Sequence, residues 1–180
     1  MYFNYWEFIS IENLFQAWNG FKVGKRKKLD VMLFERFLEE NISNLHLELK
    51  NKIYQHGSYH SFYVHDPKLR HIHKATVTDR VVHHLLYKYL YEVFDKTFIY
   101  DSYSCRLEKG THKGVIRLAK FSRIVSQNYK KECWALKLDI KKFFANVDHE
   151  ILMKLLKQKS ADPDILWLLK EIISSFSIGF

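Results

Sequence analysis

The sequence predicts an α+β fold: several helices, one β-hairpin and a single further strand that ends in a carboxylate. Three observations predict it. Apolar residues recur at helical spacing in long segments, two strand-forming runs flank a turn, and one later stretch alternates apolar and polar residues. Hydrophobic residues make up 47% of the 180 residues, enough for the core of one domain, or of one domain and part of another.

Two helices are predicted before the hairpin. The stretch Tyr5–Trp18 is rich in aromatic and aliphatic residues and predicts a helix that stops near Asn19 and Gly20. A second helix is predicted over residues 31–53, with its apolar positions at Val31, Phe34, Leu38, Ile42, Leu45 and Leu49.

The hairpin is predicted from its composition. Residues 59–64 are strand formers, Asp66-Pro67-Lys68 has turn chemistry, and residues 69–74 supply the returning strand. Residues 79–94 then form the clearest helix of the sequence, because their apolar residues recur at positions i, i+1, i+4 and i+5.

A strongly basic segment follows. From Arg106 to Lys131 there are eight Lys or Arg residues and one acid. We expect an irregular stretch to Gly110 and then a helix to about Gln127, with one basic stripe. That stripe is Lys113, Arg117 and Lys120. Charge alone leaves two interpretations open, a solvated face and a track for a phosphate backbone. The net charge of +9 and the pI near 9.4 favour a polyanionic partner.

The stretch 134–140 alternates and predicts a strand. One face carries Trp134, Leu136, Leu138 and Ile140, and the other carries Ala135, Lys137 and Asp139. Asp139 would therefore end a half-buried strand on the face away from the core. There it fits a cap or an ion-pair partner as well as a metal ligand.

Two helices are predicted after this strand. Asp148 is the expected N-cap of the first, and Asp162-Pro163 opens the second, since proline is favourable at the first helical position. The buried face of the first helix is predicted at Ile151, Leu152, Leu155 and Leu156.

Four blocks of sequence occur in order between residues 62 and 156. They are Lys68-Leu69-Arg70-His71-Ile72, Asp79-Arg80-Val81-Val82-His83-His84, Ser102-Tyr103-Ser104-Cys105-Arg106-Leu107-Glu108-Lys109-Gly110-Thr111-His112 and Leu138-Asp139-Ile140-Lys141-Lys142-Phe143-Phe144-Ala145-Asn146-Val147-Asp148-His149. Together they resemble bacterial reverse transcriptases of the group II intron and retron-like group. The resemblance implies fingers built of helices and a β-hairpin, followed by the first strand and helices of the palm. It divides the chain into an N-terminal helical extension (1–55), fingers (56–131) and the start of the palm (132–180).

The resemblance also implies roles for the block around Asp139. Asp139 matches the first metal-binding carboxylate, and Ile140 would lend its backbone carbonyl to a metal. Lys142 and Phe143 would offer backbone amides to a triphosphate. Phe144 matches the steric gate, an aromatic ring that rejects ribonucleotides by crowding the 2′-hydroxyl.

Basic residues in the other blocks carry expected contacts. Lys68 and Arg70 match fingers residues near the incoming nucleotide, although they also fit solvated hairpin charge. Arg106 could contact the template or brace its own loop, and the sequence leaves both open. The residues expected to face template or primer phosphates are Lys113, Arg117 and Lys120.

These matches imply an RNA-directed DNA polymerase that uses Mg²⁺, an RNA template, a DNA primer and deoxynucleoside triphosphates. A cognate structured RNA is a further candidate partner. The family's second carboxylate pair, in a Tyr-x-Asp-Asp hairpin, lies outside this sequence, as do the primer grip and the thumb. We therefore expect the chain alone not to polymerise. The alternatives are a non-catalytic RNA-binding protein, either a polymerase relic or one half of a split enzyme, and a basic structural subunit.

Histidines and cysteines suggest less. Seven of the ten histidines lie between His56 and His84, but no Cys or acidic ligand completes a zinc pattern around them. Contacts to RNA, or exposed polar positions, fit them better. The two cysteines fit reduced thiols in the cytoplasm. No apolar run approaches the roughly 20 residues of a membrane span, and no signal peptide is evident.

Overall fold

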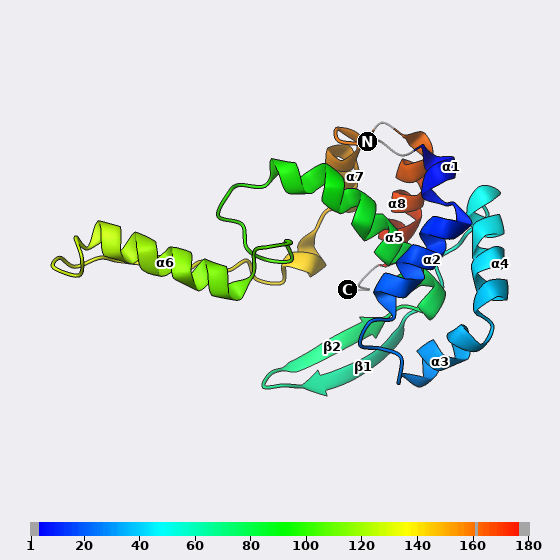
Figure 1. The fold of residues 1–180 in the computed structure, drawn as a ribbon, viewed down its shortest axis with the longest axis horizontal. Coiled ribbons are helices and arrows are strands. Elements are labelled where there is room, and N and C mark those ends of the chain that lie inside the picture. The colour runs from blue at the N-terminus through cyan, green and yellow to red at the C-terminus, as the bar shows by residue number, and fades with distance from the viewer. Residues whose placement is uncertain (1–3, 161, 177–180) are drawn as a thin grey trace. The chain divides into compact units, whose positions relative to one another are not determined.

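The computed structural model describes residues 4–160 and 162–176. Helices and one antiparallel hairpin confirm the predicted α+β class (Figure 1). The chain forms two compact units: unit 1 comprises Met1–Tyr91 and Asp148–Phe180, and unit 2 comprises Glu92–Val147. The division into extension, fingers and palm follows family organisation rather than contacts, and it stays a prediction.

Unit 1 begins with two helices where one was predicted. α1 spans Tyr5–Phe8 and α2 spans Ile11–Phe21. Ser10 separates them because its hydroxyl accepts a hydrogen bond from the backbone N–H of Asn13 and caps α2. The predicted stop near Asn19-Gly20 is confirmed, since α2 ends at Phe21. Gly20 lies in the last turn of α2, where its missing side chain admits the ring of His84.

The predicted helix over 31–53 is also divided. α3 spans Leu29–Arg36 and α4 spans Leu38–Lys50, with Phe37 between them in a non-helical conformation (φ −119°, ψ 37°). The side-chain amide of Asn41 donates to the carbonyl of Phe34 at 3.0 Å and satisfies a group that the break exposes. The predicted apolar face is otherwise correct: Val31, Phe34, Ile42, Leu45 and Leu49 are buried and Leu38 is half-buried.

The hairpin confirms the prediction. β1 (His60–His65) pairs antiparallel with β2 (Leu69–Lys74), in a register that runs from His60 opposite Lys74 to His65 opposite Leu69. Most of its residues are exposed. α5 (Val77–Phe94) follows, and it buries Val77, Asp79, Val81, Val82, Leu85, Leu86 and Tyr89.

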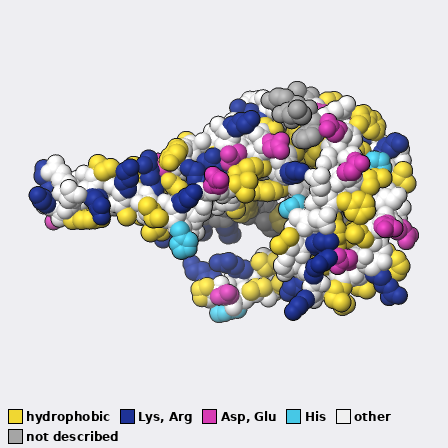
Figure 2. Space-filling model, viewed as in Figure 1, with side chains coloured by type: hydrophobic (Ala, Val, Ile, Leu, Met, Phe, Trp, Pro, Cys, Tyr) yellow, Lys and Arg dark blue, Asp and Glu magenta, His cyan; other side chains and the backbone are white. Residues whose placement is uncertain are grey.

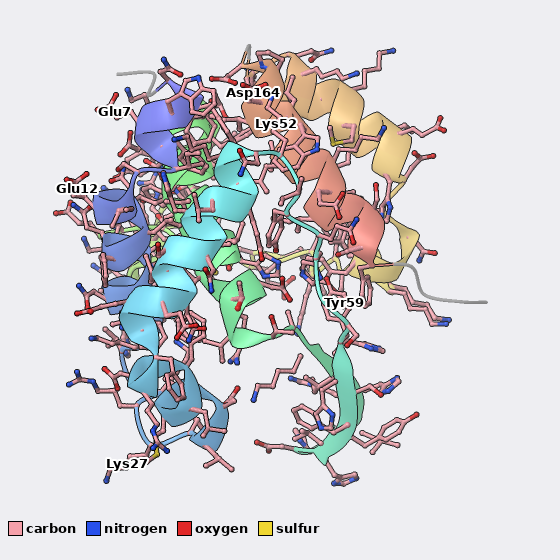
Figure 3. All side chains as sticks on the ribbon, turned by 90° about the vertical axis from the view of Figure 1, so that its right-hand side faces the viewer. Glu7, Glu12, Lys27, Lys52, Tyr59 and Asp164 are labelled. Atoms are coloured by element: carbon pink, nitrogen blue, oxygen red, sulfur yellow. The ribbon has the colours of Figure 1, made fainter. Side chains whose placement is uncertain are left out.

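The last two helices begin where predicted. α7 spans His149–Lys157 and α8 spans Pro163–Ser175. Asp148 accepts from the N–H of Glu150 at 2.8 Å, and Asp162 accepts from the N–H of Asp164 at 2.9 Å. Lys52, at the end of α4, pairs with Asp164 and ties α8 to the N-terminal helices (Figure 3).

The buried face predicted for α7 was wrong in part. Leu156 is buried, but Ile151 is 59% and Leu155 is 53% exposed. Helical spacing places the four predicted residues on one stripe of α7. Among the described residues of unit 1, side chains cover that stripe fully only at Leu156. α8 attaches more fully, through buried Ile165, Leu168 and Leu169.

Unit 2 holds a short 3₁₀ helix η1 (Asp95–Thr97), helix α6 (Thr111–Val125) and a second 3₁₀ helix η2 (Phe143–Asn146). The basic helix was therefore predicted correctly. α6, which is described throughout, has no buried residue. Across both units, none of the described helices is long and apolar enough to cross a membrane.

The strand predicted over 134–140 does not form. Residues 132–140, all described, have no regular secondary structure, and Trp134 and Leu138 are 93% and 81% exposed. A strand forms only when a neighbouring strand accepts its hydrogen bonds. Among the described residues only β1 and β2 pair, and nothing covers the alternating apolar face.

Candidate nucleic-acid interface

Arg106 braces the loop that precedes α6. Its guanidinium donates to the carboxylate of Asp95 at 2.7 Å and to the backbone carbonyl of the same residue at 3.1 Å. It also donates to the carbonyl of Ile99 at 3.2 Å and lies over the ring of Phe98. The structure thus shows the bracing contact that the sequence left open, and the template contact stays a prediction.

Two tyrosines and a lysine form the centre of this loop. Nζ of Lys109 lies 3.8 Å from the ring centre of Tyr100 and 5.2 Å from that of Tyr103. The same amine donates to the carbonyl of Tyr100 at 2.8 Å. Tyr103 packs on Gly114 of α6, where an added Cβ would lie 3.4 Å from the ring. The contact holds the loop against the helix.

Arg117 joins α6 to the loop through Asp101. Its Nε donates to Asp101 at 2.8 Å, and the phenol of Tyr103 donates to the same carboxylate at 3.0 Å. The hydrogen bond from Arg117 is the main reason that the pKa of Asp101 lies below its usual value, and it raises the pKa of Arg117 itself. The guanidinium also lies over the rings of Tyr100 and Phe121.

Tyr100, Tyr103 and Lys109 of the loop and Arg117 of α6 line a cleft of about 500 Å³ within unit 2. All four residues predicted to contact nucleic acid lie in its wall: Arg106, Lys113, Arg117 and Lys120. Lys109 adds a fifth cation, against two acids, Asp95 and Glu108, among the described lining residues. In Figure 2, Lys and Arg side chains alternate with apolar ones over the surface of α6. The cleft is therefore cationic, with aromatic walls, as sites for phosphate backbones and stacked bases are.

Sequence reasoning missed three residues of this cleft. Tyr100, Tyr103 and Lys109 were not assigned a contact, yet all three line it. Aromatic residues interleaved with basic ones at 100–109 were the available signal, since this composition is typical of single-stranded nucleic-acid sites.

The segment around Asp139 keeps the predicted turn but not the strand. Asp139 and Ile140 are exposed on the irregular stretch. Lys142 adopts the left-handed conformation (φ 51°) and begins η2, and no side chain in the described part of the chain caps the amides of that turn. Backbone N–H groups in such a turn are suited to binding anions.

Two phenylalanine rings follow this turn. Phe143 and Phe144 meet edge to face with ring centres 5.2 Å apart, and Phe144 is 87% exposed. The ring expected to act as the steric gate is therefore open to a ligand.

Magnesium prefers oxygen ligands, so Asp139 and the carbonyl of Ile140 are of the right chemical type. Within residues 4–160 and 162–176, however, no group of three or more His, Cys, Asp or Glu side chains is placed to hold a metal. The magnesium ligands therefore stay a prediction.

Lys68 and Arg70 lie on the exposed hairpin of unit 1. Lys68 is in the turn, where its carbonyl accepts from Asp66 at 3.3 Å, and Arg70 is opposite Val64 on β2. The base of the hairpin is fastened to α3, because Asp30 accepts from Lys74 at 2.7 Å and from Arg80 at 2.5 Å. Both predicted side chains are thus exposed on a ribbon that is held at its base.

Comparison with known proteins identifies a family. A family model described as reverse transcriptase (RNA-dependent DNA polymerase) matches residues 64–178, which include most of the hairpin, α5, the cleft, the Asp139 segment, α7 and α8. No curated protein matches the chain. The family match covers more than half of the chain, and the chain therefore belongs to the reverse transcriptase (RNA-dependent DNA polymerase) family.

Proposed function

We propose that this chain is the N-terminal part of an RNA-directed DNA polymerase of the group II intron and retron-like group. It would copy an RNA template from a DNA primer with deoxynucleoside triphosphates. Its cytoplasmic location is part of the same proposal. The observation that carries the proposal is the single cleft that gathers Arg106, Lys113, Arg117 and Lys120 in a chain that belongs to this family.

In this proposal the cleft of unit 2 holds the template or primer backbone. Lys113 and Lys120 are exposed on α6, and no ion pair engages either amine among the described residues. They are therefore available to phosphates. Arg106 and Arg117 are held by Asp95 and by Asp101, so they shape the cleft as well as charging it.

The incoming nucleotide would meet a second set of groups. The backbone amides of Lys142 and Phe143 would bind the triphosphate, and the exposed ring of Phe144 would crowd a 2′-hydroxyl. Lys68 and Arg70 would add positive charge from the hairpin. The left-handed turn at Lys142 and the exposure of Phe144 support these roles.

Magnesium belongs to the proposal through Asp139 and the carbonyl of Ile140. Asp139 is the one carboxylate that the family resemblance assigns to the metals in this sequence, and one carboxylate does not organise two ions. The purified chain should therefore show no primer extension. Extension that Asp139→Asn abolishes would contradict this expectation.

Binding tests the proposal. The full chain is titrated into a fluorescein-labelled RNA–DNA primer–template, and anisotropy is read at several salt concentrations. The double variant Lys113→Gln/Lys120→Gln should bind about tenfold more weakly, with a shallower salt dependence, because two phosphate contacts are lost. The control Lys27→Gln/Lys28→Gln removes the same charge from exposed positions in unit 1. Equal losses in the two variants would refute a specific role for the cleft.

A non-catalytic RNA-binding protein, whether a relic or a split half, is the second candidate. The basic and aromatic residues that line the cleft fit this candidate equally well. In that case Asp139→Asn would leave RNA binding unchanged. A split half and a relic are distinguished by adding a second polypeptide that carries the family's other carboxylates. Primer extension would then appear for a split half and not for a relic.

A further inference from the structure

A groove of about 640 Å³ runs along the face that α7 and α8 share in unit 1. Four half-buried apolar side chains line it: Met153, Leu166, Trp167 and Ile173. Met153 belongs to α7, whereas Leu166, Trp167 and Ile173 belong to α8, where Leu166 and Ile173 neighbour buried Leu169 at helical spacing and are themselves only half-buried. The groove is thus an outer surface of unit 1 and not part of the core.

Lysines from both helices edge this groove. Lys154 and Lys157 are exposed on α7, and Lys170 is exposed on α8. Within the described ranges 4–160 and 162–176 none of the three amines makes an ion pair. Glu150 is the acid among the described lining residues. Three lysines against one acid give the groove a net positive charge, which favours an anionic occupant.

Trp167 indicates which anion fits. Its ring is half-exposed in the groove, and in the described part of the chain it makes no contact with another aromatic ring. Lys170 is one turn further along α8, and Lys154 and Lys157 are across the groove on α7. A free aromatic face between amines is the combination that binds single-stranded nucleic acid, with a base on the ring and phosphates on the cations.

We propose that this groove binds a single-stranded segment of RNA, with a base stacked on Trp167 and phosphates on Lys154, Lys157 and Lys170. The identity of the polyanion rests on the proposed function, because the polymerase works on RNA. The site itself rests on α7 and α8 alone. The groove would hold RNA on unit 1 in addition to the cleft of unit 2.

The test uses the full chain and a fluorescein-labelled uridine oligonucleotide of about 12 nucleotides, within the usual site size of such proteins. The triple variant Lys154→Gln/Lys157→Gln/Lys170→Gln is compared with Lys27→Gln/Lys28→Gln/Lys50→Gln. The control lysines are exposed in unit 1 and remove the same net charge. Lys27 is labelled in Figure 3 at the end of unit 1 away from α7 and α8.

We expect the groove variant to bind at least about tenfold more weakly at about 0.1 M salt, and the slope of log affinity against log salt to fall by about 2, for three lost contacts to a single strand. Trp167→Ala should weaken binding by about fivefold or more, and Trp167→Phe should retain most of the affinity, since it keeps a ring for stacking. Circular dichroism checks that each variant is folded. If the groove variant and the control variant bind RNA with the same affinity and the same salt dependence, the proposal is wrong.

Two further outcomes distinguish RNA binding in the groove from binding in the cleft and from protein docking. If Lys113→Gln/Lys120→Gln leaves binding unchanged while the groove triple weakens it, the cleft proposal fails and the groove stands. If neither the groove triple nor Trp167→Ala affects RNA, but the groove triple abolishes binding of an acidic amphipathic peptide, the groove is a protein-docking surface and the RNA proposal is wrong.

Discussion

The phenol of Tyr54 donates a 2.7 Å hydrogen bond to Oδ1 of Asp79, and each of these residues is only 2% exposed. Asp79 also accepts from Oγ1 of Thr76 at 2.6 Å and from the N–H of Gly57 at 3.3 Å. Burial alone would raise the pKa of Asp79, but these donors together with nearby His56 lower it. The first acid of the block Asp79-Arg80-Val81-Val82 therefore fastens the segment before the hairpin to the start of α5.

Removing this carboxylate should destabilise unit 1. Asp79→Ala leaves the buried phenol of Tyr54, the half-buried N–H of Gly57 and the hydroxyl of Thr76 without their acceptor, and should lower the free energy of unfolding by about 3 kcal/mol. Tyr54→Phe removes one donor, leaves two, and should cost about 1 kcal/mol. Urea unfolding followed by circular dichroism measures both. Asp66→Ala in the exposed turn is the control, and a loss from Asp79→Ala no larger than the control's would contradict the structural role.

Stability should fall as the pH drops below about 6.5, the ordinary pKa of histidine, partly because of His83. Burial lowers the pKa of His83, the neighbouring His56 and Arg80 lower it further, and Asp79 opposes them. Nε2 of His83 lies 3.1 Å from Nε2 of His56. The ring of His56 also contacts the phenol of Tyr59, and its backbone N–H donates to the carboxylate of Glu171. The unfolded chain thus takes up a proton at His83 at a higher pH than the folded chain does. The contribution of His83 to the free energy of unfolding is therefore complete above about pH 6.5 and is lost as the pH falls below it.

The variant His83→Gln should therefore have a flatter pH dependence. Urea midpoints at about pH 8 and about pH 5.5, on either side of the ordinary histidine pKa, should differ less in the variant than in the parent chain. Some dependence should persist, because burial also lowers the pKa of His84. An unchanged difference between the two pH values would show that His83 does not titrate in this way.

Asp101→Asn should strengthen nucleic-acid binding. Asp101 neutralises Arg117 at the cleft, and the substitution would leave that guanidinium free for a phosphate. We expect tighter binding of an RNA–DNA primer–template and a salt slope steeper by roughly 0.7 to 0.9. Glu12→Gln, which removes one negative charge from an exposed position of unit 1 (Figure 3), is the control. An effect equal to the control's would mean that only net charge matters.

Phe144→Val should relax sugar discrimination without affecting folding. The ring is 87% exposed and contacts Phe143, so little stability depends on it. In a polymerase assembled from this chain and the remaining catalytic carboxylates, ribonucleotide incorporation relative to deoxynucleotide should rise. Phe143→Val is the matched control. Unchanged exclusion of ribonucleotides would assign the gate to another residue.

Local signals predicted most of the secondary structure. The starts of α7 and α8 were predicted from nearby signals, an aspartate cap at Asp148 and a proline at the first helical position in Asp162-Pro163. The breaks at Ser10 and Phe37 were missed, because a short polar residue and an aromatic one both fit the interior of a helical pattern. The strand at 134–140 was wrong because pairing depends on residues far away in sequence, which alternation does not reveal.

In the candidate site, too, the features set by local sequence were predicted and those set by distant contacts were not. The stripe of Lys113, Arg117 and Lys120 follows from helical spacing, and the structure brings the three together in one cleft with Arg106. The bracing of Arg106 by Asp95 could not be read from the sequence, because it depends on how an irregular loop folds back. The roles of Asp139 and Phe144 come from the resemblance, and they stay predictions.

Photochemical cross-linking would locate nucleic acid bound in the cleft of unit 2. The full chain is bound to an RNA–DNA primer–template, irradiated with ultraviolet light and digested, and the attached peptides are identified by mass spectrometry. We expect cross-links at Tyr100, Tyr103 or Lys109, whose side chains line the cleft. Efficient cross-linking that is confined to unit 1 and spares these residues would contradict this expectation.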